Sequence, residues 1–182
     1  MANFGQLGLQ NLQKAVLNSV VGLGIGFGIV LSMSSSASAQ AAYGSYIGVG
    51  GSFGVTDNPT NGDGGSGAGV IAFRYKFLEL PISVRAQALI GEATAFVPTV
   101  SYDVPINWQT DAYIGMGAAI QNSDQSATPV GNQTAFVLQP GVDYSFPYSN
   151  VVLFGNAIIA FDAYKNSNAT AASFQGGVGV RF

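Results

Sequence analysis

The feature that most constrains this chain is a period-two alternation of apolar residues, repeated over eight segments between residues 43 and 182. One such segment places Ile71, Phe73, Tyr75 and Phe77 on odd positions and Ala68, Ala72, Arg74 and Lys76 on even ones. Successive side chains of a β-strand point to opposite faces, so this period is that of a strand and not of a helix. The alternation therefore predicts eight strands, each with one apolar face and one face of small and polar residues.

Charged residues obey the same alternation. Seven of them lie well inside the predicted strands, and all seven have the parity opposite to the apolar residues: Arg74, Lys76, Arg85, Asp103, Asp111, Asp143 and Arg181. A slip of one residue would put these charges among the apolar side chains, so the register is strongly specified. The pattern predicts one charge cluster on the non-apolar face.

The connections between the predicted strands alternate between long and short. Longer loops are expected at 56–67, 121–132 and 162–169, a shorter one at 92–94, and tight turns at 78–81, 105–107 and 146–150. The predicted strands have about 10–13 residues, enough to cross a membrane at a tilt. This organisation predicts an all-β, antiparallel, up-and-down arrangement of eight strands, with the longer loops at one end and the tight turns at the other.

The small number of charged residues indicates whether the apolar face points toward lipid or toward a protein core. Only 8% of the residues are charged, against about 25% in ordinary soluble domains. Residues 40–182 contain no apolar run of the ~18 residues that a membrane helix needs. We therefore expect a transmembrane β-barrel with its apolar face toward lipid. The alternative is a secreted soluble β-sandwich, but its outer face would carry more Lys, Glu, Thr and Ser than this chain offers.

Residues 1–39 have the pattern of a cleaved signal peptide. Lys14 is their only charge, residues 20–31 are apolar, and Ala37-Ser38-Ala39 is a small-x-small cleavage motif before Gln40. The alternative is a retained anchor, since the Gly24–Gly28 spacing can pack helices. We expect removal of 1–39, which leaves residues 40–182 as the barrel domain.

Composition also limits the function. The chain has no Cys and no His, so it lacks thiolate ligands, the commonest metal-binding nitrogen and the commonest general base. A net charge of −3 argues against nucleic acid as a partner. We expect no cofactor, no metal and no enzymatic activity. The charge cluster could line an ion path, but the interior of a narrow barrel favours paired charges that form a structural plug.

Aromatic residues gather where the predicted strands meet the chain termini and the tight turns. Such a girdle marks a membrane interface, here expected on the periplasmic side. Its predicted members are Tyr43, Tyr75, Phe77, Tyr102, Trp108, Tyr144 and Phe182.

Taken over residues 43–182, the pattern resembles the small outer-membrane barrels of the OmpA/OmpX type. The most specific part is the last strand, where Phe174, Val178, Val180 and Phe182 share one parity and look like the signal read by the outer-membrane assembly machinery. The resemblance implies a location in the outer membrane of a Gram-negative-type bacterium and contact with its lipid and lipopolysaccharide. We expect a monomer.

The function expected from these observations is that of a non-enzymatic integral outer-membrane protein with an envelope-structural or surface-contact role. Two alternatives stay open at this point. One is a narrow porin or solute channel, and the other is a secreted soluble sandwich or adhesin.

Overall fold

A computed structural model describes residues 44–56, 67–121, 128–165 and 167–182 of the chain. The predicted signal peptide, its cleavage site and Tyr43 lie outside the described residues. Within them, no helix is long and apolar enough to cross a membrane. The strands are β1 (Tyr46–Gly54), β2 (Gly67–Lys76), β3 (Ile82–Ile90), β4 (Thr94–Asn107), β5 (Thr110–Gln121), β6 (Ala135–Ser145), β7 (Val151–Phe161) and β8 (Ala171–Arg181).

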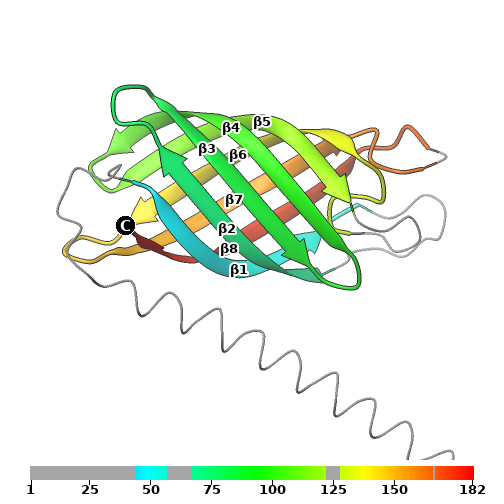
Figure 1. Cartoon of the computed structure of the whole chain (residues 1–182), viewed down its shortest axis with the longest axis horizontal. Coiled ribbons are helices and arrows are strands. Elements are labelled where there is room, and N and C mark those ends of the chain that lie inside the picture. Colours follow the sequence, from blue (N-terminus) through cyan, green and yellow to red (C-terminus); the bar gives the residue numbers. More distant parts are fainter. Residues whose placement is uncertain (1–43, 57–66, 122–127, 166) are drawn as a thin grey trace, which may run out of the picture. The chain divides into compact units, whose positions relative to one another are not determined.

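The eight strands close into one antiparallel barrel in sequence order (Figure 1). Each strand pairs with the next along the chain, and β1 closes the ring by pairing with β8. Tyr46, for example, lies opposite Arg74 on β2 and opposite Arg181 on β8. Closure leaves no strand with unpaired backbone groups at an edge, which is the condition for strands to cross a bilayer. The predicted eight-stranded up-and-down topology is confirmed.

The two ends of the barrel differ in their connections. The short-turn end carries the connections 77–81, 108–109 and 146–150, together with the start of β1 and the end of β8. At the other end, the loop end, β1, β3, β5 and β7 finish and β2, β4, β6 and β8 begin.

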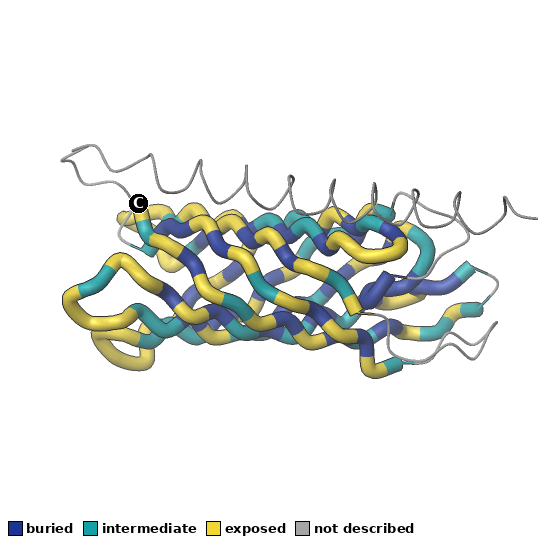
Figure 2. The backbone as a smooth tube through the Cα atoms, turned by 90° about the horizontal axis from the view of Figure 1, so that it is seen from below, coloured by how far each residue is buried: buried dark blue, intermediate teal, exposed yellow. Residues whose placement is uncertain are grey.

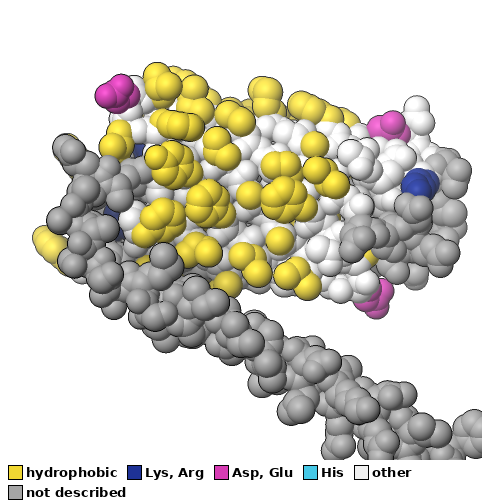
Figure 3. Space-filling model, in the orientation of Figure 1, with side chains coloured by type: hydrophobic (Ala, Val, Ile, Leu, Met, Phe, Trp, Pro, Cys, Tyr) yellow, Lys and Arg dark blue, Asp and Glu magenta, His cyan; other side chains and the backbone are white. Residues whose placement is uncertain are grey.

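Burial alternates residue by residue along the strands, as the tube in Figure 2 shows. Apolar side chains of the predicted apolar face, such as Phe53, Ile114 and Val178, are exposed on the outside of the barrel. In Figure 3 they cover the barrel wall, and the visible charged side chains lie toward its two ends. A soluble sandwich would bury this face, so that alternative is wrong. A closed barrel with an apolar exterior is a transmembrane barrel, because lipid is the solvent that such a wall requires.

One predicted turn was misplaced. A turn was expected at residues 105–107, but β4 continues to Asn107 and the chain reverses at Trp108 and Gln109. The register between β4 and β5 shifts between Pro105 and Asn107, which marks a bulge. Proline has no N–H to donate to the sheet, and a bulge is one of the places in a strand that tolerate it. Trp108, predicted to begin the fifth strand, instead lies in the turn.

Candidate functional site: the barrel interior

Six of the seven predicted lumen charges come together inside the barrel near the short-turn end. We call this set the charge network: Arg74, Lys76, Arg85, Asp103, Asp111 and Asp143. Five strands, β2 to β6, supply its members. Three positive and three negative side chains make it neutral overall. Parity alone was enough to predict that these residues share the interior face.

Two arginines organise the charge network. Arg74 reaches three carboxylates, with Nη2 at 2.8 Å from Asp103 Oδ2 and 3.0 Å from Asp111 Oδ2, and Nη1 at 2.9 Å from Asp143 Oδ2. Arg85 Nη2 lies 2.9 Å from Asp143 Oδ2 and 3.3 Å from Asp103 Oδ1. Lys76 Nζ lies 2.8 Å from Asp111 Oδ2, nearer the barrel mouth. Every carboxylate of the network thus has a cationic partner.

Hydroxyl groups complete the hydrogen bonding around these ion pairs. Tyr46 donates to Asp143 Oδ1 at 3.0 Å, and Ser101 donates to Asp103 Oδ1 at 2.9 Å. The two arginines use their Nε atoms on serines, Arg74 on Ser83 and Arg85 on Ser101. Buried charges are tolerated when they are paired and fully hydrogen-bonded, and this arrangement meets that condition.

Arg181, the seventh predicted charge, occupies a different place. Its Nη2 donates to the main-chain carbonyl of Ser149, in the turn between β6 and β7. The residue is half-buried at the end of β8. It therefore contacts a turn of the short-turn end.

A layer of amides and hydroxyls follows toward the middle of the barrel. Thr99 donates to Gln139 Oε1 at 2.6 Å, and Gln139 Nε2 donates to Asn156 Oδ1 at 3.2 Å. Gln175 Nε2 on β8 donates to the hydroxyls of Ser52 and of Ser173, which lies opposite Ile158 nearer the loop end. These side chains are all buried, so they fill the lumen at this level.

The interior near the loop end is apolar, which sequence reasoning missed. We call this set the apolar layer: Val70, Leu89, Val97, Ala119, Val137, Ile158 and Ala171, one residue from each of β2 to β8. All but Val70 have no exposed surface, and Val70 is 3% exposed. A signal was present, since Val70-Ile71, Leu89-Ile90, Phe96-Val97, Val137-Leu138 and Ile158-Ile159 are each apolar at both parities. Such pairs mark strand positions that are covered on both faces.

Residues of three connections at the loop end close over the apolar layer. We call this the loop clasp: Thr56, Val130, Gly131, Ala163 and Tyr164. Val130 and Ala163 have no exposed surface and belong to the same buried cluster as the apolar layer. Backbone N–H groups of Asn132 and Gln133 both donate to Ala163 O, and the Thr56 and Tyr164 hydroxyls lie 3.3 Å apart.

Gly131 permits the close approach of the two loops within the clasp. Its φ of 103° belongs to a region that residues with a side chain rarely adopt. A Cβ at this position would lie 2.2 Å from Ala163 O. Sequence reasoning predicted loops at 121–132 and 162–169 and did not predict their contact.

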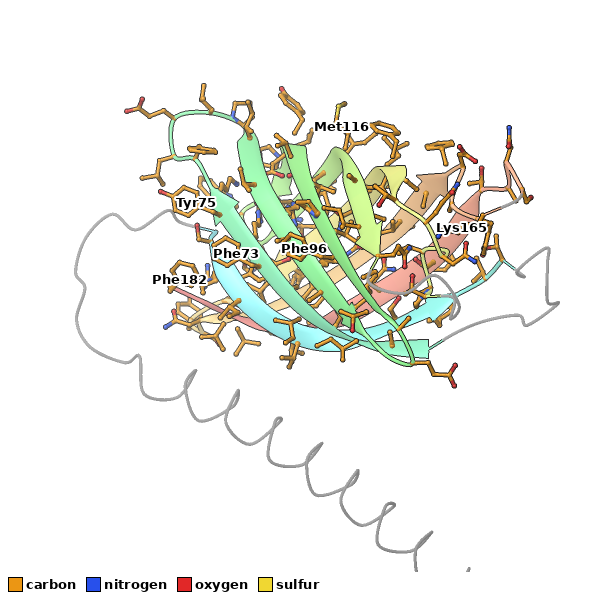
Figure 4. All side chains as sticks on the ribbon, turned by 45° about the vertical axis from the view of Figure 1, so that its right-hand side comes forward. Phe73, Tyr75, Phe96, Met116, Lys165 and Phe182 are labelled. Carbon is orange, nitrogen blue, oxygen red and sulfur yellow. The ribbon has the colours of Figure 1, made fainter. Side chains whose placement is uncertain are left out.

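The described members of the predicted aromatic girdle lie on the outer wall of the barrel, except Trp108, which lies in the turn between β4 and β5. Tyr75, Phe77, Tyr102, Trp108 and Phe182 are exposed and Tyr144 is half-buried. Figure 4 shows Phe73, Tyr75 and Phe182 gathered at one end and Lys165 at the other. The rings of Phe73 and Phe182 stack at 6.2 Å between centroids. In the last strand, Phe174, Val178, Val180 and Phe182 all face outward.

The described residues hold no group of three or more potential metal-binding side chains. The lumen carboxylates of Asp103, Asp111 and Asp143 form ion pairs with arginine and lysine.

Solved structures with the same architecture were found by comparison of the fold. Neisserial surface protein A matches with a TM-score of 0.53 and 16% identity, covering 76% of this chain and 97% of that one. Ail, the attachment invasion locus protein of Yersinia pestis, matches with a TM-score of 0.54, 18% identity and the same coverages. A second Ail structure, in complex with the heparin analogue sucrose octasulfate, matches with a TM-score of 0.52.

Comparison by sequence finds neither a matching family model nor a matching curated protein. The likeness therefore concerns architecture: this chain has the fold of the small eight-stranded outer-membrane β-barrels, the type that its residue pattern resembles.

Proposed function

We propose that this protein is an integral outer-membrane barrel with a plugged interior, and that it serves the envelope as a structural or surface-contact protein. The observation that carries the proposal is an apolar outer wall around a lumen whose described side chains are mostly buried. An eight-stranded barrel has an interior just wide enough to be filled in this way. A solute channel would need an accessible lining, and most of the lumen side chains that the structure describes are buried.

The interior also offers little to a substrate. Asp103 and Asp143 are almost fully buried, and both are held by arginines and hydroxyl groups. A general acid or base must come within hydrogen-bond reach of the group it serves. These contacts support a non-enzymatic role.

The net charge of the loop-end segments indicates which kind of surface partner this chain could bind. The segments that join the strands there contain Asp57, Asp63, Glu92, Asp124 and Asp162 but only one cation, Lys165, so their net charge is 1 − 5 = −4. Sucrose octasulfate, the polyanion bound by Ail, would be repelled by such a surface. We propose that any surface partner of this chain is neutral or cationic, while lipid and lipopolysaccharide acyl chains cover the apolar wall.

Reconstitution into a planar bilayer tests the proposal. The folded protein, recognised by its heat-modifiable migration on a gel, should give no conductance steps under conditions in which a large porin conducts. Fractionation should find it in the outer membrane. Discrete conductance of the unmodified protein, or its recovery as a soluble species, would overturn the proposal.

A further inference from the structure

We propose that the barrier to ions in this barrel is the apolar layer beneath the loop clasp, and that the charge network, although it spans the lumen, is not the barrier. This inference rests on the proposed function, namely a barrel that does not conduct. It assigns the closure to one layer and therefore predicts which substitutions turn the barrel into a pore.

The lumen changes its chemistry along its length. The charge network lies toward the short-turn end, followed by the amide and hydroxyl side chains around Gln139 and then by the apolar layer. An ion that enters a polar layer can exchange one charged or amide partner for another. An ion in the apolar layer would lose its hydration with few polar side chains to replace it, which is the costliest step in crossing a protein interior.

Water reaches the charge network from the short-turn end. The side chains of Lys76 and Asp111, its outermost members, are 22% and 19% exposed, whereas Arg74 behind them is 3% exposed. The solvent exposure of the network side chains thus decreases from the short-turn end toward the interior of the barrel. The corresponding positions at the other end, Val130 and Ala163 of the loop clasp, have no exposed surface.

The apolar layer extends around most of the ring. Seven strands contribute an apolar side chain, whereas β1 contributes Ser52 and Gly54, both buried, and Ser52 accepts a hydrogen bond from Gln175. The loop clasp covers the layer from outside and is held by backbone hydrogen bonds to Ala163 O and by the contact between Thr56 and Tyr164. A small opening in the clasp would therefore still leave the layer itself in place.

Two double variants, made in the full chain and matched in the residues they introduce, separate the two layers. Leu89→Ser with Ile158→Ser removes bulk from the apolar layer and adds hydroxyl groups that can hold water. Arg85→Ser with Asp143→Ser removes one cation and one anion from the charge network, so no net charge is left behind. After reconstitution in a planar bilayer, the first variant should conduct discretely and the second should stay silent. Heat-modifiable migration shows whether each one is folded.

A second measurement does not depend on opening the barrel. The chain contains no Cys, so a single thiol can be introduced as a reporter. Ser101→Cys places it at the charge network and Val137→Cys in the apolar layer, both with little change in size. Silver ion added to the reconstituted barrel should consume the thiol at position 101 and spare the one at 137. The remaining thiol is titrated after removal of silver and unfolding.

The outcomes are distinct. Conductance of the unmodified protein contradicts the proposed function. A silent unmodified protein with a conducting charge-network variant, or with a folded but silent apolar-layer variant, overturns the present inference. Equal protection or equal reaction of the two thiols overturns it as well, even where the double variants do not fold.

Discussion

Arg74 on β2 and Asp143 on β6 form an ion pair across the full width of the lumen, with Nη1 and Oδ2 2.9 Å apart. In a closed ring of eight strands, β2 and β6 lie opposite each other, four strands apart in either direction. These two side chains therefore bridge the lumen, and their ion pair connects opposite walls of the barrel.

Removing Arg74 should strongly destabilise the folded barrel. Arg74→Met would leave Asp103 and Asp143 buried with one cationic partner fewer, and breaking a buried ion pair from one side costs about 3–5 kcal/mol. Unfolding by denaturant in lipid vesicles measures this loss. Lys76→Met is the matched control, because Lys76 lies in a partly exposed pair with Asp111 and should cost clearly less. Equal losses for the two variants would contradict the view of Arg74 as the central cation.

Gly141 and Tyr113 form a cross-strand pair in which the glycine makes room for the ring. A Cβ at Gly141 would lie 2.4 Å from Tyr113 Cζ, and the Arg85 guanidinium covers the ring at 3.3 Å from its centroid. Gly141→Ala should therefore destabilise the barrel by about 1–3 kcal/mol through overpacking. In a Tyr113→Ala background the same change should cost less, and the loss that is left comes from Asn156, whose Cβ would lie 2.7 Å from the new Cβ. A double-mutant cycle measures the coupling, and additive losses would refute it.

Much of this architecture follows from the sequence because a strand has a period of two and a closed barrel has only two faces. The lumen position of Arg74 and the lipid position of Ile114 both follow from parity. Parity gives no depth, however, so the segregation of charged, amide and apolar layers along the lumen was not predicted. The loop clasp was missed for another reason: the contact of Gly131 with Ala163 depends on loop conformation rather than on periodicity.

Gly131→Ala should open the loop clasp without disturbing the wall of the barrel. The alanine would sit at a φ of 103°, at a cost of about 1–2 kcal/mol, and its Cβ would meet Ala163 O. We expect faster proteolysis of the loops with unchanged heat-modifiable migration. Gly51→Ala is the control, because a Cβ there would have no neighbour within 4 Å. Equal protease resistance of both variants would argue that the two loops are not held together.

Phe182 should affect biogenesis more than stability. Its ring stacks on Phe73 at the outer wall, a contact of about 0.5–1.5 kcal/mol beyond area burial. Because the last strand resembles the assembly signal, Phe182→Ser should lower the amount of protein in the outer membrane while the purified variant still folds in detergent. Phe182→Tyr, which keeps the aromatic ring, should restore normal levels. Unchanged outer-membrane levels of the serine variant would contradict the predicted signal.

The wall of the barrel should show a gradient of cost with membrane depth. Ile114 lies near the middle of β5 and is 52% exposed on the outer face, whereas Thr110 begins the same strand at the short-turn end. Arginine on the lipid face costs about 2–4 kcal/mol at the bilayer midplane and about 0–1 near the interface. Ile114→Arg should thus destabilise the barrel strongly and Thr110→Arg only slightly.

Reversible unfolding in lipid vesicles, with both variants beside the unmodified protein, measures this gradient. Ile114→Leu serves as the control for the loss of packing at the same site, and it should be nearly neutral because an apolar side chain is kept. A lumen-facing position provides the complementary test. Gly115, the residue after Ile114 in β5, is buried in the lumen. Gly115→Ala adds a Cβ 3.5 Å from Gln139, an ordinary contact, and its effect should be small and independent of lipid thickness. Equal losses at positions 110 and 114 would mean that the wall does not cross a bilayer in the predicted orientation.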